Sequence, residues 1–327
     1  MKGTTEPALR RGPPTMPDLR LLLILTENDT LVPPGDLRAL VQMAVAAEEA
    51  GFDAVMASEH VVLGPSAGAL GRPRNPREYA APGNQDPSME WPSSNLLLAA
   101  VAAATERVRL VMGAIIAPLR HPVLLAKELA TLDRLSEGRL VVQPTVSWHR
   151  DEYAALGVPF ERRGRILDEQ LTAMSALWRD TPASHHGDHF AFDDVYCVPK
   201  PWRGGRPRMW FGGQGMHDAL LRRLVAYGDG FHPFGPVADA DLTRLRTVLA
   251  EAGRDPDGFE MVGGTRATFP TVDGVADLDA ALADLPRQLE QGFTTFCVKP
   301  SQHVDDPAEV PALCRHAVDH VRSLGRV

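Results

Sequence analysis

The chain has little cysteine, and none of it is spaced for a disulfide framework or a metal site. Its 327 residues include three cysteines, Cys197, Cys297 and Cys314. They lie far apart and form no CxxC or CxxxH pair, so a zinc site is not indicated. We interpret them as reduced, structural thiols, which is what we expect of a cytoplasmic protein.

Long apolar runs and an excess of positive charge are also missing. The longest apolar run near the start, Leu19 to Leu25, is far shorter than the roughly 20 residues that cross a bilayer, and it has no small-residue cleavage site. Acidic side chains outnumber basic ones by 42 to 34, which gives a net charge of -8. Because nucleic-acid surfaces need clustered, uncompensated Lys and Arg, we expect neither a nucleic-acid partner nor a membrane partner.

What the chain does have is a regular change of apolar period. Val108 to Ile116 is a β-branched run typical of a strand buried on both faces. From His121-Pro122 to Leu135, leucines recur at three- and four-residue steps, which predicts an amphipathic helix. Leu140 to Val142 predicts a second buried strand, which we expect to break at Pro144. Strand, helix and strand within about thirty residues form a βαβ unit.

The same alternation extends over most of the chain. The patterns predict further strands at 19–25, 53–57, 207–211, 229–233, 259–263 and 293–298, and further helices at 37–51, 96–105, 166–178, 218–227, 242–252, 278–290 and 310–324. This succession, without a linker of different composition, predicts one (β/α)8 TIM-barrel domain at residues 18–327. Residues 1–17 lack any apolar period and predict a flexible tail.

Three stretches read ATERVRL, PLRHPVLLAKELATLDRLSEGRL and RDEYAALGVPFERRGRILDE. Together they resemble the bacterial luciferase-like family of flavin- or deazaflavin-dependent oxidoreductases, and the similarity extends from about Leu19 to about Phe234. The resemblance implies a TIM barrel with its cofactor at the carboxyl mouth, a small-molecule substrate and a homodimer. It also implies that residues 185–200 form a hairpin inserted before the fifth strand.

The longest segment without an apolar period, residues 61–92, is rich in proline and glycine. Loops of this length inside a compact domain are usually functional or disordered. Because this one follows the second strand, at the end of the barrel where catalysis occurs, it is a candidate substrate lid. The alternative is a mobile insertion.

His60 is the candidate catalytic residue, because it follows the second strand and an imidazole can exchange a proton near neutral pH. Deazaflavin enzymes of the family commonly place a histidine here, preceded by an acid, as in Glu59-His60. Glu59 either orients His60 or pairs with an arginine. A histidine held structurally by a neighbouring carboxylate is the alternative for His60.

Two regions are expected to bind the cofactor, one at its phosphate and one behind its ring. Gly212-Gly213-Gln214-Gly215 lies between a strand and a helix, where small residues let backbone N–H groups approach a phosphate. In the family this loop helps hold the cofactor phosphate. Gly113-Ala114-Ile115 matches the strand that bends behind the cofactor ring in several relatives. A tight turn and an ordinary buried strand are the respective alternatives.

A third cofactor-binding region follows the fourth strand. Thr145 and Ser147 offer hydroxyl groups and Trp148 offers an aromatic plane. Asp151 matches the acidic segment that the family has next.

The same region departs from the family pattern. Gln143-Pro144 replaces part of a glycine-rich run, and Val146 stands where luciferases use a phosphate-binding arginine. Arg150 is a candidate to replace that arginine.

The remaining histidines give weaker signals. His185, His186 and His189 are close together, but the resemblance implies that their segment is an exposed hairpin, so we interpret them as solvent-facing and predict no metal site. His232 ends the sixth predicted strand and is a candidate to face the pocket. No HxH motif follows the first strand, which disfavours a metal-dependent hydrolase.

The resemblance leaves two cofactors open. PLRHP and QPTVSWHRDEY look most similar to family members that use the deazaflavin F420, which predicts hydride transfer to or from a small organic substrate. The alternative is an FMN-dependent monooxygenase. A non-catalytic flavin-binding barrel is a second alternative, because glycines are missing at 143–147.

Overall fold

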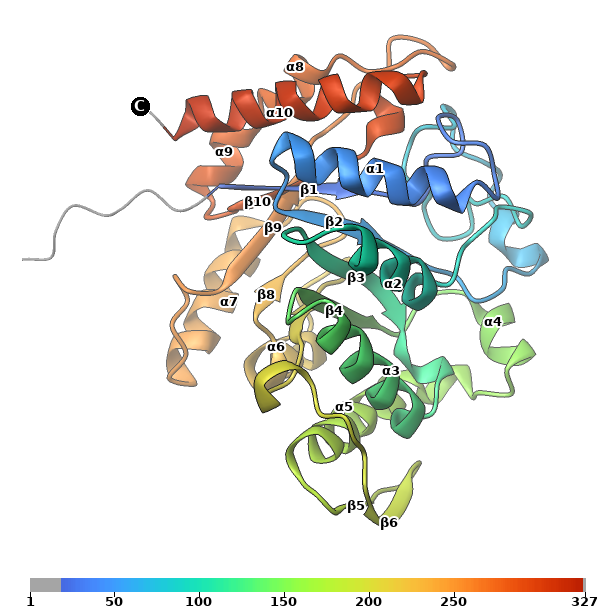
Figure 1. The fold of residues 1–327 in the computed structure, drawn as a ribbon, viewed down its shortest axis with the longest axis vertical. Coiled ribbons are helices and arrows are strands. Elements are labelled where there is room, and N and C mark those ends of the chain that lie inside the picture. The colour runs from blue at the N-terminus through green and yellow to red at the C-terminus, as the bar shows by residue number, and fades with distance from the viewer. Residues whose placement is uncertain (1–18, 326–327) are drawn as a thin grey trace, which may run out of the picture.

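The computed structural model describes residues 19–325, and eight of its strands form a closed barrel (Figure 1). The order around the barrel is β1-β10-β9-β8-β7-β4-β3-β2, and every neighbouring pair is parallel. The strands are β1 Arg20–Ile24, β2 Ala54–Ala57, β3 Arg109–Ile116, β4 Leu140–Thr145, β7 Arg208–Phe211, β8 Gly230–Phe231, β9 Glu260–Gly264 and β10 Thr295–Val298. This architecture confirms the predicted TIM barrel. The tail predicted at 1–17 lies outside the described residues.

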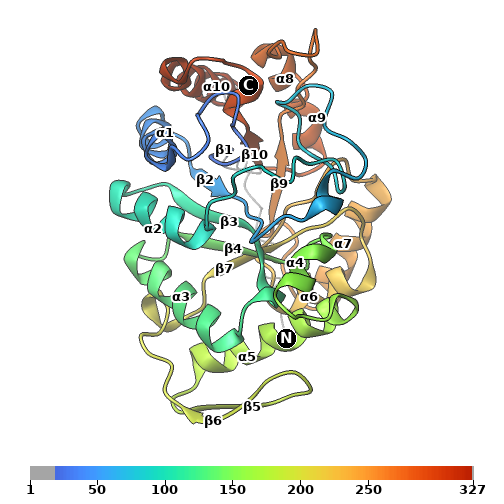
Figure 2. The same ribbon diagram turned by 90° about the vertical axis from the view of Figure 1, so that its right-hand side faces the viewer.

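Helices surround the strands, as the view in Figure 2 shows. They are α1 Leu37–Ala50, α2 Ser94–Ala104, α3 Pro122–Leu135, α4 Arg150–Ala155, α5 Arg163–Arg179, α6 Asp218–Tyr227, α7 Asp239–Glu251, α8 Leu278–Leu282, α9 Leu285–Glu290 and α10 Val310–Leu324. Their ends follow local chemistry. Asp36 accepts the Ala39 N–H at the start of α1, and Gly51 adopts a left-handed φ of 101° at its end. None of these helices is long and apolar enough to cross a membrane.

Each barrel strand is buried on both faces, because neighbouring side chains on a strand point to opposite sides. In β1, Leu22 and Ile24 belong to the cluster inside the barrel, whereas Leu21 and Leu23 pack toward the helices. The inner cluster also contains Ala54, Met56, Val111, Val141, Trp210, Val262 and Cys297. The apolar run at 21–25 therefore supplies side chains to two separate cores.

Several predicted boundaries differ from the structure, and two of the differences involve a proline. The helix predicted at 278–290 is two short helices, α8 and α9, separated at Ala283 and Asp284. Pro286 stands in the first turn of α9, where its missing N–H cannot continue the hydrogen bonding of the preceding turn. The fourth strand also continues past Pro144 to Thr145. Pro144 is tolerated because it lies beyond Val142, the last β4 residue paired with β7.

Two strands lie outside the barrel. β5, Ala183–His186, pairs antiparallel with β6, Ala191–Val195, and the two form a separate hairpin below α5 in Figure 1. The segment 61–92 contains a short 3-10 turn at Pro65–Gly68 but no strand or α-helix.

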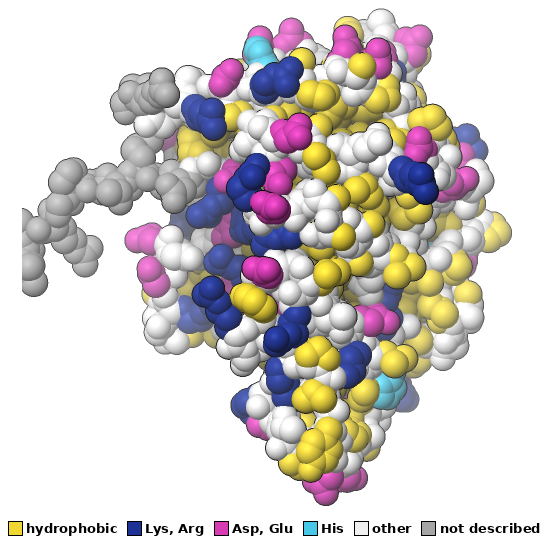
Figure 3. Space-filling model, viewed as in Figure 1, with side chains coloured by type: hydrophobic (Ala, Val, Ile, Leu, Met, Phe, Trp, Pro, Cys, Tyr) yellow, Lys and Arg dark blue, Asp and Glu magenta, His cyan; other side chains and the backbone are white. Residues whose placement is uncertain are grey.

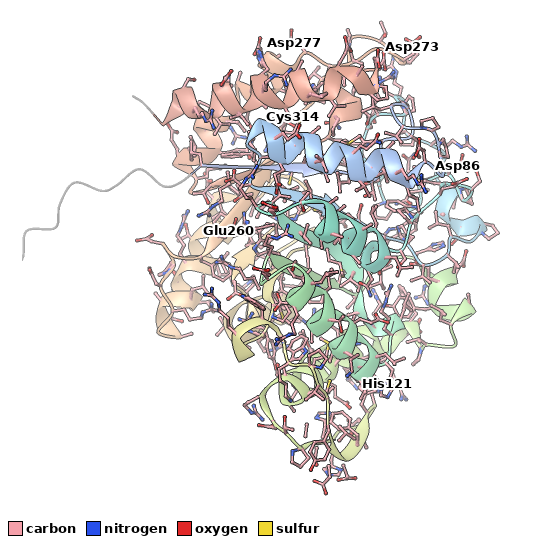
Figure 4. All side chains as sticks on the ribbon, viewed as in Figure 1. Asp86, His121, Glu260, Asp273, Asp277 and Cys314 are labelled. Atoms are coloured by element: carbon pink, nitrogen blue, oxygen red, sulfur yellow. The ribbon has the colours of Figure 1, made fainter. Side chains whose placement is uncertain are left out.

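A buried ion pair joins the amino ends of the barrel strands. Glu260, which is labelled in Figure 4 and is the first residue of β9, accepts two hydrogen bonds of 2.8 Å from Arg109, the first residue of β3, and one of 2.6 Å from Thr295 of β10. Burial alone would raise the pKa of Glu260, but the hydrogen bonds and charge of Arg109 hold it below its ordinary value. The carboxylate therefore stays charged and ties together strands that are distant in sequence.

We predict that Glu260→Ala lowers the free energy of unfolding by roughly 3–5 kcal/mol, because it leaves Arg109 as a partly buried charge without its partner. Urea denaturation followed by circular dichroism measures this loss. The matched control, Glu290→Ala, removes an exposed glutamate and is expected to change stability by less than about 0.5 kcal/mol. Equal effects of the two substitutions would contradict the prediction.

Candidate active site

A cavity of about 1320 Å³ opens where the carboxyl ends of the barrel strands meet. The predicted site residues that line it are His60, Glu59, Gly113, Ala114, Thr145, Ser147, Trp148, Gly212, Gly213, Gln214 and Gly215. Side chains of the 61–92 loop, including Tyr79 and Trp91, line it as well. The closed barrel thus brings together residues that are up to about 150 positions apart in the sequence.

Two predicted site residues do not line the cavity. Ile115 is fully buried in the outer core, since its place on β3 turns its side chain toward the helices. Asp151 instead accepts hydrogen bonds from the N–H and Oγ of Ser66, at 3.2 and 2.8 Å. The expectation that these two contact the cofactor is therefore corrected. Asp151 anchors the 61–92 loop.

His60 lies at the cavity wall with a buried carboxylate beside it. Its Nδ1 is 3.1 Å from Oε2 of Glu152, which is fully buried on α4. The indoles of Trp91 and Trp148 meet the imidazole edge to face, with ring centroids 5.1 and 5.8 Å away. The sequence pointed to the acidic pair at 151–152, but nothing in it showed that Glu152 is the member that faces His60.

Glu59 pairs with an arginine, the second of its two predicted alternatives. Its oxygens accept hydrogen bonds of 2.8 and 3.0 Å from Arg120, one of 2.8 Å from the hydroxyl of Ser94 and one of 3.1 Å from the N–H of Ile116. Ser94 begins α2, Ile116 ends β3, and Arg120 lies between β3 and α3. Glu59 therefore joins the carboxyl end of β2 to its neighbours, while Glu152 contacts His60.

The backbone of β3 is irregular where the resemblance implied support for a ring. The Gly113–Ala114 peptide bond is cis, and the pairing with β4 shifts register between Gly113 and Ile115. A Cβ at position 113 would lie 2.7 Å from Sδ of Met56. A side chain at position 113 would therefore require Met56 to move, and Gly113 and Ala114 present the bulge to the cavity.

The loop after β7 also depends on a glycine. A Cβ at Gly212 would lie 1.6 Å from the carbonyl oxygen of His232, so β7 and the segment after β8 touch through bare backbone. Gly213 and Gly215 have no such contact and leave space on the cavity side. α6 begins directly afterwards, where its N-terminal N–H groups favour a negative charge.

Sequence reasoning missed Arg223, one of three arginines that line the cavity. Arg223 lines the cavity from α6, its Nε donates to Asp168 at 2.6 Å and its Nη2 donates to the carbonyl of Gly164 at 3.0 Å. Arg150, the predicted substitute for the luciferase arginine, instead pairs with Glu161 at 2.5 Å on the surface. The expectation for Arg150 is therefore wrong, because its side chain is bound outside the cavity.

The 61–92 loop is attached to the barrel at both of its sides. Near its start, the N–H of Gly64 donates to Nε2 of the buried His149 at 2.8 Å. Farther along, the amide of Asn75 donates to the carbonyls of Thr271 and Gly274, at 3.2 and 2.8 Å. Arg77 donates to the carbonyl of Asp273 at 2.8 Å. The loop crosses the cavity mouth and contributes to its lining.

His232 faces the cavity, as its position after β8 suggested. Its Nδ1 is 2.8 Å from Oε1 of Gln143, and its Nε2 is 3.6 Å from the sulfur of Cys297. Burial lowers the pKa of His232 to about 4 and raises the pKa of Cys297 to about 12. This part of the cavity floor is therefore polar but uncharged near neutral pH.

The other predicted histidines lie on the outer hairpin. His186 pairs with Asp193 at 3.0 Å, and His185 lies 3.5 Å from Glu169. Across residues 19–325, no three or more His, Cys, Asp or Glu side chains are arranged to hold a metal ion.

Comparison with known proteins gives a family match over most of the chain. The family model described as luciferase-like monooxygenase matches residues 20–293. An uncharacterized protein of Mycobacterium tuberculosis is 36% identical over 161 residues, which are 48% of this chain and 56% of that protein. The FMNH(2)-dependent dimethylsulfone monooxygenase of Pseudomonas putida is 33% identical over 189 residues, 57% of this chain and 51% of the enzyme. The chain thus spans about half the length of these curated relatives.

Solved structures with the same fold include enzymes of two cofactor types. An F420-dependent secondary alcohol dehydrogenase superimposes with a TM-score of 0.68 at 17% identity, covering 93% of this chain and 99% of that one. The oxygenating constituent of 3,6-diketocamphane monooxygenase of Pseudomonas putida, in complex with FMN, gives a TM-score of 0.68 at 18% identity over 93% and 98%. At these identities the likeness shows the fold alone.

The pKa of His232 predicts a pH dependence of stability. Because its pKa is about 4 in the folded protein and about 6.5 in an unfolded chain, the unfolded state binds the proton first as the pH falls. Stability is therefore lost between about pH 6.5 and about pH 4. We expect His232 to account for roughly 2 kcal/mol of the loss between about pH 7.5 and pH 5.

Urea denaturation at the two pH values, on the wild type and on His232→Gln, measures this contribution. The variant should lose less stability on acidification than the wild type. His186→Gln, which removes an exposed histidine, should behave as the wild type does. If His232→Gln and the wild type lose the same amount, the assignment to His232 is wrong.

Proposed function

Because this chain belongs to the luciferase-like monooxygenase family, we propose that it is an oxidoreductase that uses the deazaflavin F420. In this proposal it transfers hydride to or from a small organic substrate in the cavity at the carboxyl mouth. The observation that carries the proposal is His60, whose imidazole lines the cavity while Glu152 holds its Nδ1. Hydride transfer between an alcohol and a carbonyl needs such a group, since a proton must move with the hydride.

The residues present fit a tricyclic cofactor with a phosphate-bearing side chain. The cavity of about 1320 Å³ is larger than the roughly 300–1,000 Å³ of an ordinary ligand pocket, so it has room for a cofactor and a substrate together. Gly113 and Gly212 occupy places where a Cβ would collide with Met56 or His232. Nε1 of Trp91, which also lines the cavity, is buried without a partner in the described part of the chain and can donate to a ligand.

The proposal gives each wall of the cavity a role. Gly113 and Ala114 would support the ring, while Thr145, Ser147 and Trp148 would flank it. The phosphate would be bound by the N–H groups of the loop Gly212 to Gly215 and by Arg223, an arginine of α6 that lines the same cavity. When bound, the deazaflavin supplies a carbon that accepts or releases hydride.

Residues of the chain would transfer the proton and limit the access of water. His60 would take a proton from the substrate, or return it, at the ring nitrogen opposite Glu152. The 61–92 loop, tied down through Asn75 and Arg77, would serve as the lid that limits the entry of water. Trp91 comes from this loop and Trp148 follows β4, and both indoles pack against the His60 ring edge to face.

An FMN-dependent monooxygenase is the second candidate. The similarity to the FMNH(2)-dependent dimethylsulfone monooxygenase favours it, since that relative is 33% identical over 57% of this chain. The same cavity would then hold reduced FMN, and His60 would protonate or deprotonate the oxygenated substrate. The two candidates differ in the ring system they require, so binding distinguishes them.

The experiment that tests the function is a titration of the purified protein with F420 and with FMN, followed by quenching of the ligand fluorescence. We expect F420 to bind at least about tenfold more tightly than FMN, which corresponds to about 1.4 kcal/mol. Tight binding of FMN without binding of F420 would reject the deazaflavin and favour the monooxygenase. Binding of neither would reject the proposed function.

The phosphate site makes a separate prediction. Arg223→Gln should weaken the binding of F420 by about tenfold to a hundredfold, because a charge-assisted hydrogen bond to the phosphate is lost. It should leave the affinity for the deazaflavin core without the phosphate unchanged. Fluorescence titration with both ligands measures the difference.

Arg222→Gln is the matched control, since Arg222 is the exposed neighbour on the same helix. It should change neither affinity. Arg223 also binds Asp168, so thermal unfolding of each variant is recorded alongside the titrations. Equal weakening of both ligands by Arg223→Gln would mean that Arg223 supports the fold and does not contact the phosphate.

The homodimer implied by the family resemblance stays a prediction. α2 and α3 are neighbours, and they expose Leu96 and Leu124, of which 75% and 63% are accessible. Hydrophobic side chains are spread over this face in Figure 3, which makes it the candidate dimer face. Sedimentation velocity would detect the dimer, and a monomer at all concentrations would reject it.

A further inference from the structure

One carboxylate contacts both His60 and the first backbone N–H of the 61–92 loop. Oε2 of Glu152 is 3.1 Å from Nδ1 of His60, and Oε1 accepts a hydrogen bond of 2.7 Å from the N–H of Val61. The hydroxyl of Ser147 donates to Oε2 at 3.4 Å. Glu152 is fully buried, and within residues 19–325 its ion-pair partner is His60, with no Lys or Arg in contact. A buried carboxylate depends on such partners, because burial without them is costly.

The contact decides which nitrogen of His60 carries the hydrogen. A carboxylate accepts hydrogen bonds, so Nδ1 must be the donor. In a neutral imidazole the other nitrogen then has a free lone pair. Nε2 has no hydrogen-bond partner among the residues that the structure describes, and the ring lines the cavity. His60 is therefore prepared to accept a proton at Nε2.

The neighbours of Glu152 hold the same loop but do not bind His60. Nε2 of His149 accepts from the N–H of Gly64, and Asp151 accepts from Ser66. The segment 149–152 thus binds the start of the 61–92 loop at Val61, Gly64 and Ser66. Of the three side chains that do so, Glu152 is the one that also contacts His60. Asp151 consequently provides a control that disturbs the loop and leaves the imidazole contact intact.

We propose that Glu152 is the positioning residue of His60: it fixes the ring in the Nδ1–H form, and through Val61 it couples this form to the attached start of the loop. The proposal rests on the proposed function, in which His60 exchanges a proton with the substrate. It adds the direction of that exchange, since Nε2 accepts the proton when the substrate is oxidised.

In the oxidising direction, the substrate O–H bond breaks and the proton bonds to Nε2. The electron pair left on oxygen would form the second bond of the carbonyl, and the bound deazaflavin would supply the acceptor for the hydride that the adjacent carbon loses. His60 then carries a hydrogen on both nitrogens, and Glu152 is the counter-ion at Nδ1. Reduction of a carbonyl reverses each of these steps.

NMR of the cofactor-free protein labelled with ¹⁵N-histidine tests the proposal at a pH where the ring is neutral. In the wild type we expect a pyridine-type nitrogen signal for Nε2 of His60 and a pyrrole-type signal for Nδ1. The loss of these signals in His60→Gln assigns them. A wild-type spectrum with the hydrogen on Nε2 would overturn the proposal without any variant of Glu152.

Glu152→Gln should exchange the two signal types. The N–H of Val61 requires an oxygen opposite it, so the amide oxygen of the glutamine would face Val61 and its NH₂ group would face Nδ1 of His60. Nδ1 must then accept, and the hydrogen moves to Nε2. Asp151→Asn, the matched control, should leave the wild-type pattern unchanged. If Glu152→Gln folds and keeps the wild-type pattern, Glu152 does not set the tautomer.

Because this experiment contains no cofactor, its outcome is independent of the titrations with F420 and FMN. A wrong tautomer with intact F420 binding rejects the role of Glu152 and leaves the proposed function standing. The expected tautomer in a protein that binds neither cofactor rejects the proposed function instead. Circular dichroism confirms that each variant is folded.

Discussion

The closure of eight parallel strands is the constraint on which the candidate site depends. Parallel strands all end at the same side, so closing them into a barrel places eight carboxyl ends around one mouth. The side chains at these ends share one cavity although they come from distant parts of the chain. The amino ends are tied by Glu260 and Arg109, which face away from the cavity side. Stability and candidate chemistry are thus located at opposite ends of the same strands.

Three buried glutamates show how the fold divides its charges. Glu260 and Glu59 each bind an arginine and join neighbouring strands. Glu152 binds His60, which is charged only when both ring nitrogens carry a hydrogen. The charge next to Glu152 therefore changes when His60 gains or loses a proton. Arginine keeps its charge at all physiological pH values and suits a structural pair. The partner thus distinguishes Glu152, which contacts His60, from Glu59 and Glu260, which join neighbouring strands.

Two glycines, Gly113 and Gly212, allow close backbone contacts at the cavity. A side chain at Gly212 would collide with the backbone of His232 and one at Gly113 with the side chain of Met56, and both glycines line the cavity. The sequence indicated these positions because glycines at the end of a strand or before a helix suggest a close approach. It could not show what approaches. Met56 and the carbonyl of His232 became visible as neighbours only in the closed barrel.

The side chains that sequence reasoning missed or misplaced have a common cause. Asp151 and Glu152 are adjacent and both acidic, yet one binds Ser66 in the loop and the other binds His60. Arg150 and Arg223 are both arginines near the mouth, and only Arg223 lines the cavity. Residue type gave the chemistry in each case. The direction of each side chain depends on the neighbours that the fold supplies, and sequence spacing does not contain them.

The sequence by itself determined most of the strands and helices and the barrel, because short apolar runs and apolar periods of three to four residues are local signals of how each element is buried. It also located His60 and the glycines at strand ends. Tertiary structure decided the partners, since His60 and Glu152 are 92 residues apart and His232 and Gln143 are 89 apart. Hydrogen bonds over such separations form only after the strands are arranged around the barrel, so local patterns cannot specify them.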